Sequence, residues 1–218
     1  NAPEPLGSMM KDLIERRLAY PTLPMEEAFS QQLKEEELEL PAGQFALFMN
    51  SMYAVDAYVR DYFRKAALDA LLAEKLPVTV FGEGWEKYSC GDGHSLRREP
   101  AVPFALSFER IAKAHVLLNV SPIFNRGMHD RVPAGMANHA VVLTDENPYL
   151  RRTFTDGKEL LFYSLEKPDT LCEQAERTLT DVRLREKIAA SAYETFEREY
   201  TWKRRAEQIL AFAEEVEA

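Results

Sequence analysis

The stretch from Asn119 to Arg131 concentrates side chains that can bind phosphate. It follows an apolar run and enters a predicted helix near His129. A helix N-terminus offers free N–H groups and a partial positive charge, and Arg126 and Arg131 could add charge-assisted hydrogen bonds to phosphate oxygens. His129 could donate to a phosphate or a sugar hydroxyl. The same predicted diphosphate site includes Asn119, Ser121 and Gly127. In the alternative interpretation Arg131 pairs with Asp130 or lies on the surface, and His129 caps the helix.

Two glycines flank Glu83 directly after another apolar run, Val78–Phe81. Gly82 and Gly84 would let a ligand approach the backbone at the carboxyl end of a strand, where α/β proteins bind their ligands. We therefore include Gly82, Glu83 and Gly84 in the candidate site. A dinucleotide fingerprint would need a third glycine where Lys87 stands, which argues against a nicotinamide site. A tight turn with an aromatic residue packed on the core remains the alternative.

Asp145 and Asn147 follow a third apolar run. Their position at the carboxyl end of a predicted strand places them beside the same crevice, where they could hold sugar hydroxyls. The competing interpretation is that they cap the turn that starts at Pro148.

Several other classes of site are disfavoured. Cys90-Gly-Asp-Gly-His94 lacks the second ligand pair that a structural zinc site needs, so no metal site is predicted. Neither a G-x-S-x-G nucleophile elbow nor a G-x-x-x-x-G-K-[ST] phosphate loop occurs. No catalytic residue can be assigned from the sequence.

The composition limits the kinds of binding partner and the cellular compartment that we expect. The 218 residues carry a formal net charge of -9, which argues against coating nucleic acid. No apolar run approaches the roughly 20 residues that span a bilayer, and no signal peptide is visible. With only two cysteines, Cys90 and Cys172, we expect a reducing, cytoplasmic location. Asn1-Ala2 resembles the remnant of a cleaved tag, so Ser8–Met10 would lie inside or near the start of a longer natural protein.

The elements that must position these residues are strands that alternate with helices. Four apolar runs predict buried strands, separated by predicted helices such as 107–114 and 131–138. The predicted strands are Val78–Phe81, His115–Val120, Ala140–Thr144 and Leu160–Tyr163, with Pro100–Phe104 as a candidate short strand. This alternation predicts an α/β fold, a Rossmann-like parallel sheet with helices on both faces.

Helical patterns occupy both ends of the chain. We predict a helical arm over residues 1–76, with helices at 9–20 and 25–40 and either one long helix or two abutting helices at 44–75. A strand at Phe45–Met49 is the alternative. Residues 77–218 would form the ligand-binding domain, which ends in helices, the last capped by Thr201 with an apolar face that includes Trp202.

The ordered series of segments resembles the carboxy-terminal domain of the bacterial spore-maturation-protein-like glycosyltransferases, over about residues 55–212. The series runs Val-Thr-Val-Phe-Gly-Glu-Gly-Trp, His-Val-Leu-Leu-Asn-Val-Ser-Pro, Gly-Met-His-Asp-Arg-Val, Ala-Val-Val-Leu-Thr-Asp-Glu-Asn-Pro and Thr-Trp-Lys-Arg-Arg-Ala. The resemblance implies the carboxy-terminal half of a GT-B fold, with a donor site for a nucleotide-sugar and hexosyl-type transfer that needs no metal or other cofactor. It also implies an amino-terminal acceptor domain outside this chain, an unknown acceptor, and a fragment that is inactive alone.

Three positions depart from the pattern of related enzymes. Arg126 and Ala134 stand where an acidic pair would be expected, the second of which often holds the nucleotide ribose, and His139 replaces a glycine before the next strand. A non-catalytic carbohydrate- or nucleotide-binding or scaffolding module with a degenerate donor site is therefore the main alternative. A methyltransferase would need an acidic residue at the end of the second strand, where Asn119-Val120-Ser121 stands.

Overall fold

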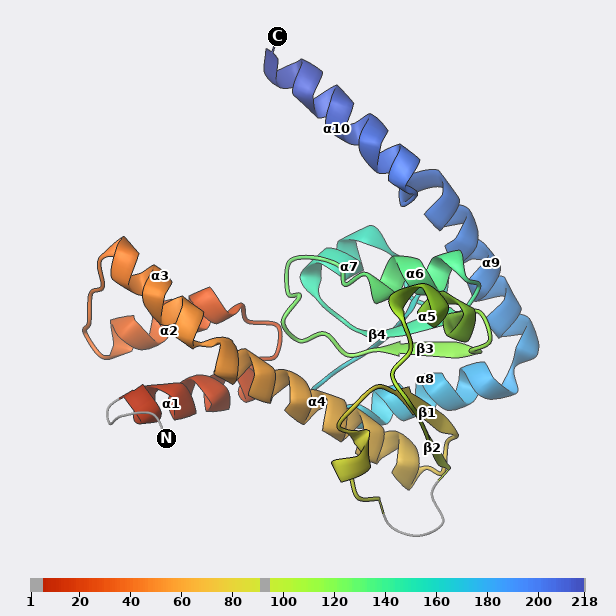
Figure 1. The fold of residues 1–218 in the computed structure, drawn as a ribbon, viewed down its shortest axis with the longest axis horizontal. Coiled ribbons are helices and arrows are strands. Elements are labelled where there is room, and N and C mark those ends of the chain that lie inside the picture. The colour runs from red at the N-terminus through yellow and green to blue at the C-terminus, as the bar shows by residue number, and fades with distance from the viewer. Residues whose placement is uncertain (1–5, 91–94, 218) are drawn as a thin grey trace.

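Four helices open the chain in the computed structural model, which describes residues 6–90 and 95–217 (Figure 1). Pro24 and Pro41 are the N-caps of the second and third helices, where their fixed φ suits a helix start. The third and fourth helices abut at Met52, as one of the two helical alternatives expected, and the alternative strand at Phe45–Met49 is wrong. The four are α1 Leu6–Ala19, α2 Met25–Glu35, α3 Ala42–Ser51 and α4 Tyr53–Ala73.

The strands form two parallel sheets. β1 Val78–Phe81 pairs with β2 Leu96–Glu99, and the larger sheet has the order β3-β4-β5, with β3 Val116–Asn119, β4 Val141–Asp145 and β5 Leu161–Tyr163. The four predicted strands are confirmed, and three of them pair in parallel as expected, whereas β1 pairs in parallel with β2 in a separate sheet.

Two details of the strand prediction are wrong. Residues 100–103 form no strand, and Phe104 begins helix α5 Phe104–Ile111. The extra strand is instead β2, which has one apolar residue among charged ones and so carries no strand pattern. β1 is not buried on both faces, since only Val80 of its four residues is buried.

Helices cover both faces of the larger sheet. Alternate residues of a strand point to opposite faces, and in β4 Val141 and Leu143 pack in the core that includes α4 and α8 Pro168–Thr180. Val142 points the other way, into a second cluster with α6 Arg131–Ala137 and α9 Val182–Glu199. This arrangement confirms the expected α/β layering.

The helical arm and the sheet share one hydrophobic core. Phe29 of α2 and Val59 of α4 belong to the same buried cluster as Leu143 and Leu161 of the sheet. α4 also contacts α8, β1 and α1, so it joins the arm to the sheet. The domain boundary at residue 77 stays a prediction.

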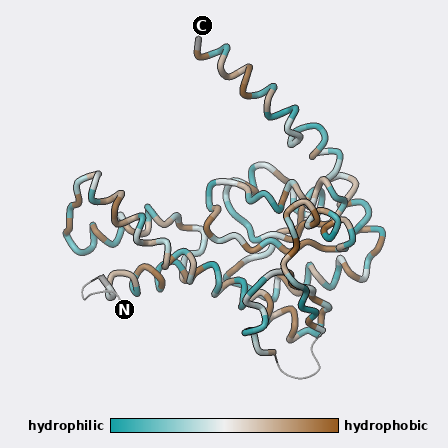
Figure 2. Tube along the Cα trace, viewed as in Figure 1, coloured by the Kyte–Doolittle hydropathy of each residue, from teal (hydrophilic) through white to brown (hydrophobic). Residues whose placement is uncertain are grey.

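The last helix, α10 Trp202–Glu217, projects away from the body of the molecule (Figure 1). Thr201 accepts a hydrogen bond from the Arg204 N–H (3.3 Å), in agreement with the predicted cap. Its predicted apolar face is not buried, since Trp202 is 89% exposed. Figure 2 shows hydrophobic colour at the centre of the molecule and mixed colour along this helix. Within the described residues, no helix is long and apolar enough to cross a membrane.

Close packing of α6 on the sheet requires a glycine at position 135. A Cβ there would stand 2.4 Å from Val142 Cγ2 and 3.0 Å from Leu117 Cδ2. We expect Gly135→Ala to lower the free energy of unfolding by about 1–2 kcal/mol, because overpacking against a buried β-branched side chain outweighs the gain in helix propensity. Urea unfolding measures it.

Gly43→Ala is the matched control, since Gly43 lies in α3 with nothing within 4 Å of its would-be Cβ. That change should stabilise the protein by about 0.5 kcal/mol. Equal effects of the two substitutions would contradict the close contact of α6 with the sheet.

Candidate functional site

The β3–α6 loop, residues 120–130, leaves the carboxyl end of β3 and is held there by buried hydrogen bonds. Asn119 donates from Nδ2 to Thr144 Oγ1 (2.9 Å), and its Oδ1 accepts from Ser121 Oγ (3.0 Å). The Tyr163 hydroxyl donates to the Asn119 carbonyl (3.1 Å). These hydrogen bonds link the carboxyl ends of β3, β4 and β5. The side chains of Asn119 and Ser121 are part of this buried network beneath the loop.

Asp145 anchors the start of this loop. Its side chain is buried, and Oδ1 accepts the Ser121 N–H (2.7 Å). Burial raises the pKa of Asp145 to about 7, although the hydrogen bonds from the backbone and the charge of Arg131 act in the opposite direction. This carboxyl lies beneath the loop, in a position to support the site rather than to reach into it.

Asn147 caps the helix α7 Pro148–Thr153. Its Oδ1 accepts the Leu150 N–H (2.8 Å), and its Nδ2 donates to the carbonyls of Phe124 (2.7 Å) and Gly127 (3.2 Å). The Asx-type cap was one of the two interpretations of the sequence, and the geometry supports it. The same side chain fixes the curvature of the β3–α6 loop.

A cationic cluster forms where this loop faces α4. We give this name to Arg60, Arg64, His129 and Arg131. Arg131 Nη1 donates to Asn119 Oδ1 (3.0 Å). Partial burial lowers the pKa of Arg131, Asp130 and Asp145 raise it, and the charge of Arg60 lowers it. The pKa of Arg64 is lowered by burial and by the charges of Arg131 and Arg60. Like charges that act on one another favour a bound anion, because the anion relieves their mutual repulsion.

The sequence analysis did not identify Arg60 and Arg64 as site residues, although their spacing does place them together on one helix face. They are four residues apart and so lie on one face of α4. Asp61 is 3.6 Å from Arg60 Nε and 4.0 Å from Arg64 Nη1, and it is mostly exposed, so it offsets their charge only in part. Nothing in the sequence indicates that α4 packs against the loop after β3.

His129 lies among charged groups that act on its pKa in opposite directions. Burial lowers its pKa, and the nearby charges of Arg131 and Arg64 lower it further, while Asp130 raises it. Its Nδ1 lies 2.5 Å from Asp130 Oδ1 and 3.2 Å from the Arg131 backbone nitrogen, so both groups compete for this atom. Nε2 has no hydrogen-bond partner among the described residues, so this atom can contact a ligand.

The expected free N–H groups at the start of α6 are not available. The Arg131 N–H bonds to His129 Nδ1, the Val132 N–H bonds to the His129 carbonyl, and Pro133 has no N–H. The helix is also only 7 residues long. Any anion at this end must therefore be held by side chains rather than by the helix terminus.

Two groups of predicted site residues are not members of the cationic cluster defined above. Arg126 is exposed and pairs with Glu27 of α2 across the loop, next to Gly127. Gly82, Glu83 and Gly84 follow β1, and β1 does not pair with the three-stranded sheet. The two glycines have φ of 119° and 90°, as a tight turn requires, and the Trp85 indole N–H donates to the Phe81 carbonyl (3.2 Å). Their part in a shared site stays a prediction.

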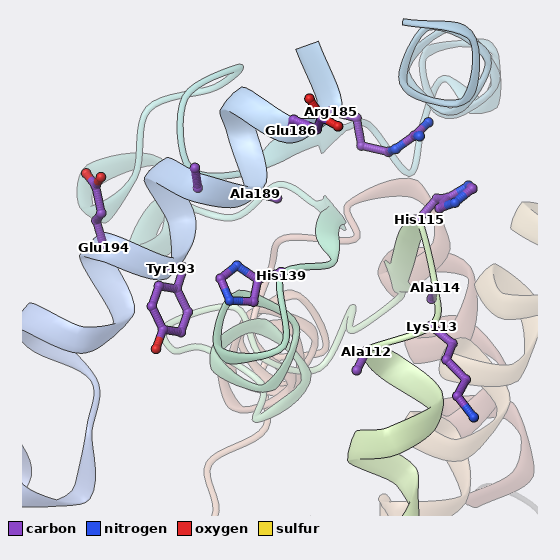
Figure 3. A pocket seen from close by; sticks show the side chains of 11 residues that line it. Ala112, Lys113, Ala114, His115, His139, Arg185, Glu186, Ala189, Tyr193 and Glu194 are labelled. Carbon is purple, nitrogen blue, oxygen red and sulfur yellow. The ribbon is translucent and has the colours of Figure 1, made fainter. Parts of the chain in front are cut away.

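A surface cavity lies at the opposite end of the strands, where β3 and β4 begin (Figure 3). Its volume is about 480 Å³, and its walls include His115 and His139, which precede β3 and β4. His139 has a left-handed φ of 57°, which explains why a glycine would suit this position. Its ring stacks on that of Tyr193, with the ring centroids 4.2 Å apart. No predicted site residue lines this cavity.

No group of three His, Cys, Asp or Glu side chains that could hold a metal ion occurs in residues 6–90 and 95–217. Part of the Cys90–His94 segment lies outside the described residues. Transfer without a metal stays a prediction.

Comparison with known proteins supports the α/β fold and the glycosyltransferase class of protein. The profile of the glycosyl transferase-like family matches residues 60–211. No curated protein matches the sequence significantly. Two crystal structures of Anabaena Alr3699/HepE, one in complex with UDP-glucose and one with UDP and glucose, superpose with TM-scores of 0.57 and 0.56 at 11% and 12% identity. Each match covers 71% of this chain but only 44% of HepE, so the chain spans less than half of those proteins.

Proposed function

This chain belongs to the glycosyl transferase-like family, and we propose that its cationic cluster binds the diphosphate of a nucleotide-sugar whose sugar is transferred to an acceptor hydroxyl. The subfamily that the sequence resembles, that of the spore-maturation-protein-like enzymes, is part of this proposal. HepE, which shares the fold, is described in complex with UDP-glucose, so a UDP-sugar is the donor that we favour.

The observation that carries the proposal is the convergence of four nitrogen-bearing side chains at the end of β3. Arg131 comes from the start of α6, His129 from the loop, and Arg60 and Arg64 from α4. Phosphate oxygens accept charge-assisted hydrogen bonds from guanidinium groups in pairs, so this set suits a diphosphate.

The same cluster would assist transfer as well as binding. As the bond between the anomeric carbon and the diphosphate breaks, negative charge builds on the leaving phosphate oxygens. Positioned cations stabilise that charge more in the transition state than in the ground state. His129 would donate one further hydrogen bond to a phosphate or sugar oxygen when Nε2 carries a proton.

Titration calorimetry with UDP-, GDP-, ADP- and dTDP-sugars tests the donor proposal. We expect a UDP-sugar to bind with an affinity that falls as salt concentration rises, because ionic contacts are screened. The Arg64→Ala variant should bind that donor about tenfold more weakly, since one phosphate contact is lost.

Arg152→Ala is the matched control, because Arg152 is an exposed arginine of α7 with no ion pair among the described residues. It should leave donor affinity unchanged. Absence of binding across the four sugar-nucleotide classes would sink the proposal. A non-catalytic binding module would bind the donor without hydrolysing or transferring it, which an assay of nucleoside diphosphate release distinguishes once an acceptor domain is supplied.

A further inference from the structure

Asp130 occupies the N-cap position of α6 but does not cap the helix. An aspartate at this position ordinarily accepts an N–H of the first turn. Here the backbone is already helical, with φ of −58° and ψ of −23°, and the side chain makes no capping hydrogen bond. The carboxylate lies instead against His129, with Oδ1 2.5 Å from Nδ1. Asp130 therefore interacts with the histidine rather than with the helix terminus.

The imidazole ring of His129 is held from two sides. Asp130 contacts Nδ1, and the ring of Phe124 packs edge-to-face on the imidazole, with the ring centroids 4.9 Å apart. The His129 side chain is only 21% exposed, whereas that of Asp130 is 74% exposed. With these two contacts made inside the protein, Nε2 is the polar atom of the ring that remains for a ligand.

The two neighbours of Nδ1 select different protonation states of the ring. The Arg131 N–H (3.2 Å) can donate only to an unprotonated Nδ1, whereas the carboxylate of Asp130 can accept only from a protonated one. A phosphate oxygen at Nε2 also needs a proton on that nitrogen. Only the imidazolium, with both nitrogens protonated, can therefore bind Asp130 and a phosphate at the same time.

Without a ligand the cationic cluster opposes a charged ring. Burial lowers the pKa of His129, and the charges of Arg131 and Arg64 lower it further, while Asp130 acts in the opposite direction. A bound diphosphate adds negative charge beside these arginines and so favours the protonated ring. Hydrogen bonds from a charged donor to phosphate are also about twice as strong as neutral ones.

We propose that Asp130 is a positioning residue that holds His129 as an imidazolium against the donor diphosphate, so that donor binding takes up a proton from solvent. The inference rests on the proposed function for the identity of the anion. The contact between Asp130 and His129 is present in the free protein, so its effect on the ring can be measured without any donor.

An NMR titration of the free protein is the first arm of the test. His129 is one of 4 histidines, and its Cε1–H signal is assigned as the one missing from His129→Gln. We expect a lower pKa of His129 in Asp130→Asn than in wild type, because a neutral amide does not stabilise the imidazolium. Asp69→Asn is the control, since that exposed carboxylate of α4 pairs with Lys65. It should leave the titration of His129 unchanged.

The second arm repeats the titration with bound UDP-glucose, whose doubly esterified diphosphate does not itself titrate near neutral pH. We expect the pKa of His129 to rise on binding, and to rise less in Asp130→Asn. The affinity for UDP-glucose should increase about tenfold as the pH falls from about 8 to about 6. Burial raises the pKa of Asp145 to about 7, so the affinity is also measured in the Asp145→Asn protein. In that background His129→Gln should abolish the pH dependence.

The outcomes separate this inference from the donor proposal. If His129 titrates identically in wild type and Asp130→Asn, the role of Asp130 is wrong, even if thermal melting shows that the substitution changes stability. If UDP-glucose binds without raising the pKa of His129, proton uptake is wrong and the donor proposal stands. If no sugar nucleotide binds, the donor proposal fails and proton uptake fails with it, whereas the titration of the free protein still decides whether Asp130 holds the proton of His129.

Discussion

Arg131→Ala is expected to lower affinity for the UDP-sugar donor about 100-fold, or ~3 kcal/mol, while leaving the melting temperature nearly unchanged. In the free protein this guanidinium is partly buried, donates to Asn119 Oδ1, and stands close to Arg60 and Arg64. Removing it relieves repulsion within the cluster, which offsets the lost hydrogen bond. If Arg131 served mainly to stabilise the fold, Arg131→Ala would lower the melting temperature and leave the donor affinity unchanged.

Calorimetry and thermal melting on the same samples separate the two roles. Arg126→Ala is an informative comparison, because the sequence places Arg126 in the same site whereas the structure pairs it with Glu27. We expect this variant to keep most of the donor affinity. A large fall in melting temperature for Arg131→Ala, with donor affinity retained, would contradict the role assigned to the cluster.

The second large effect concerns Asp145 and the pH dependence of stability. Its pKa is raised from 3.8 to about 7 by burial, so the folded state holds a proton that the unfolded state has already released across that interval. The stability linked to this proton is fully present below pH 3.8 and is lost as the pH rises towards about 7. At 1.36 kcal/mol for each pKa unit, the loss is on the order of 4 kcal/mol.

Asp145→Asn isolates this contribution. Asparagine keeps an oxygen that can accept the Ser121 N–H but carries no titrating proton. The difference in free energy of unfolding between variant and wild type should therefore grow in favour of the variant as the pH rises from near 4 to near 7, and then level off. Urea unfolding of both proteins across this interval measures it. A difference that does not change with pH would mean that Asp145 titrates at its ordinary value.

Tertiary contacts explain why Asp145 and Asn147 have hydrogen-bond partners within the protein. Asp145 and Asn147 do stand at the carboxyl end of β4, as the sequence indicates. Their hydrogen-bonding atoms, however, bond to the backbone of the β3–α6 loop and of α7. A pattern along the chain shows which polar residues follow a strand, but not which of them the neighbouring loop already uses.

For the cationic cluster, the sequence identified only part of the set. His129 and Arg131 could be identified because they follow an apolar run and begin a helix. Arg60 and Arg64 could not be assigned to the site, because their closeness to Arg131 depends on how α4 packs over the sheet edge.

The amino-acid sequence by itself determined the alternation of helices and strands, the parallel pairing and the loop after β3, because hydrophobic periodicity and proline positions act over a few residues. Only the tertiary structure decided that β1 and β2 form a separate sheet, that the N–H groups at the start of α6 are occupied, and that α4 brings two arginines to the loop. These features depend on contacts between residues far apart in the chain, for which a single sequence carries no local signal.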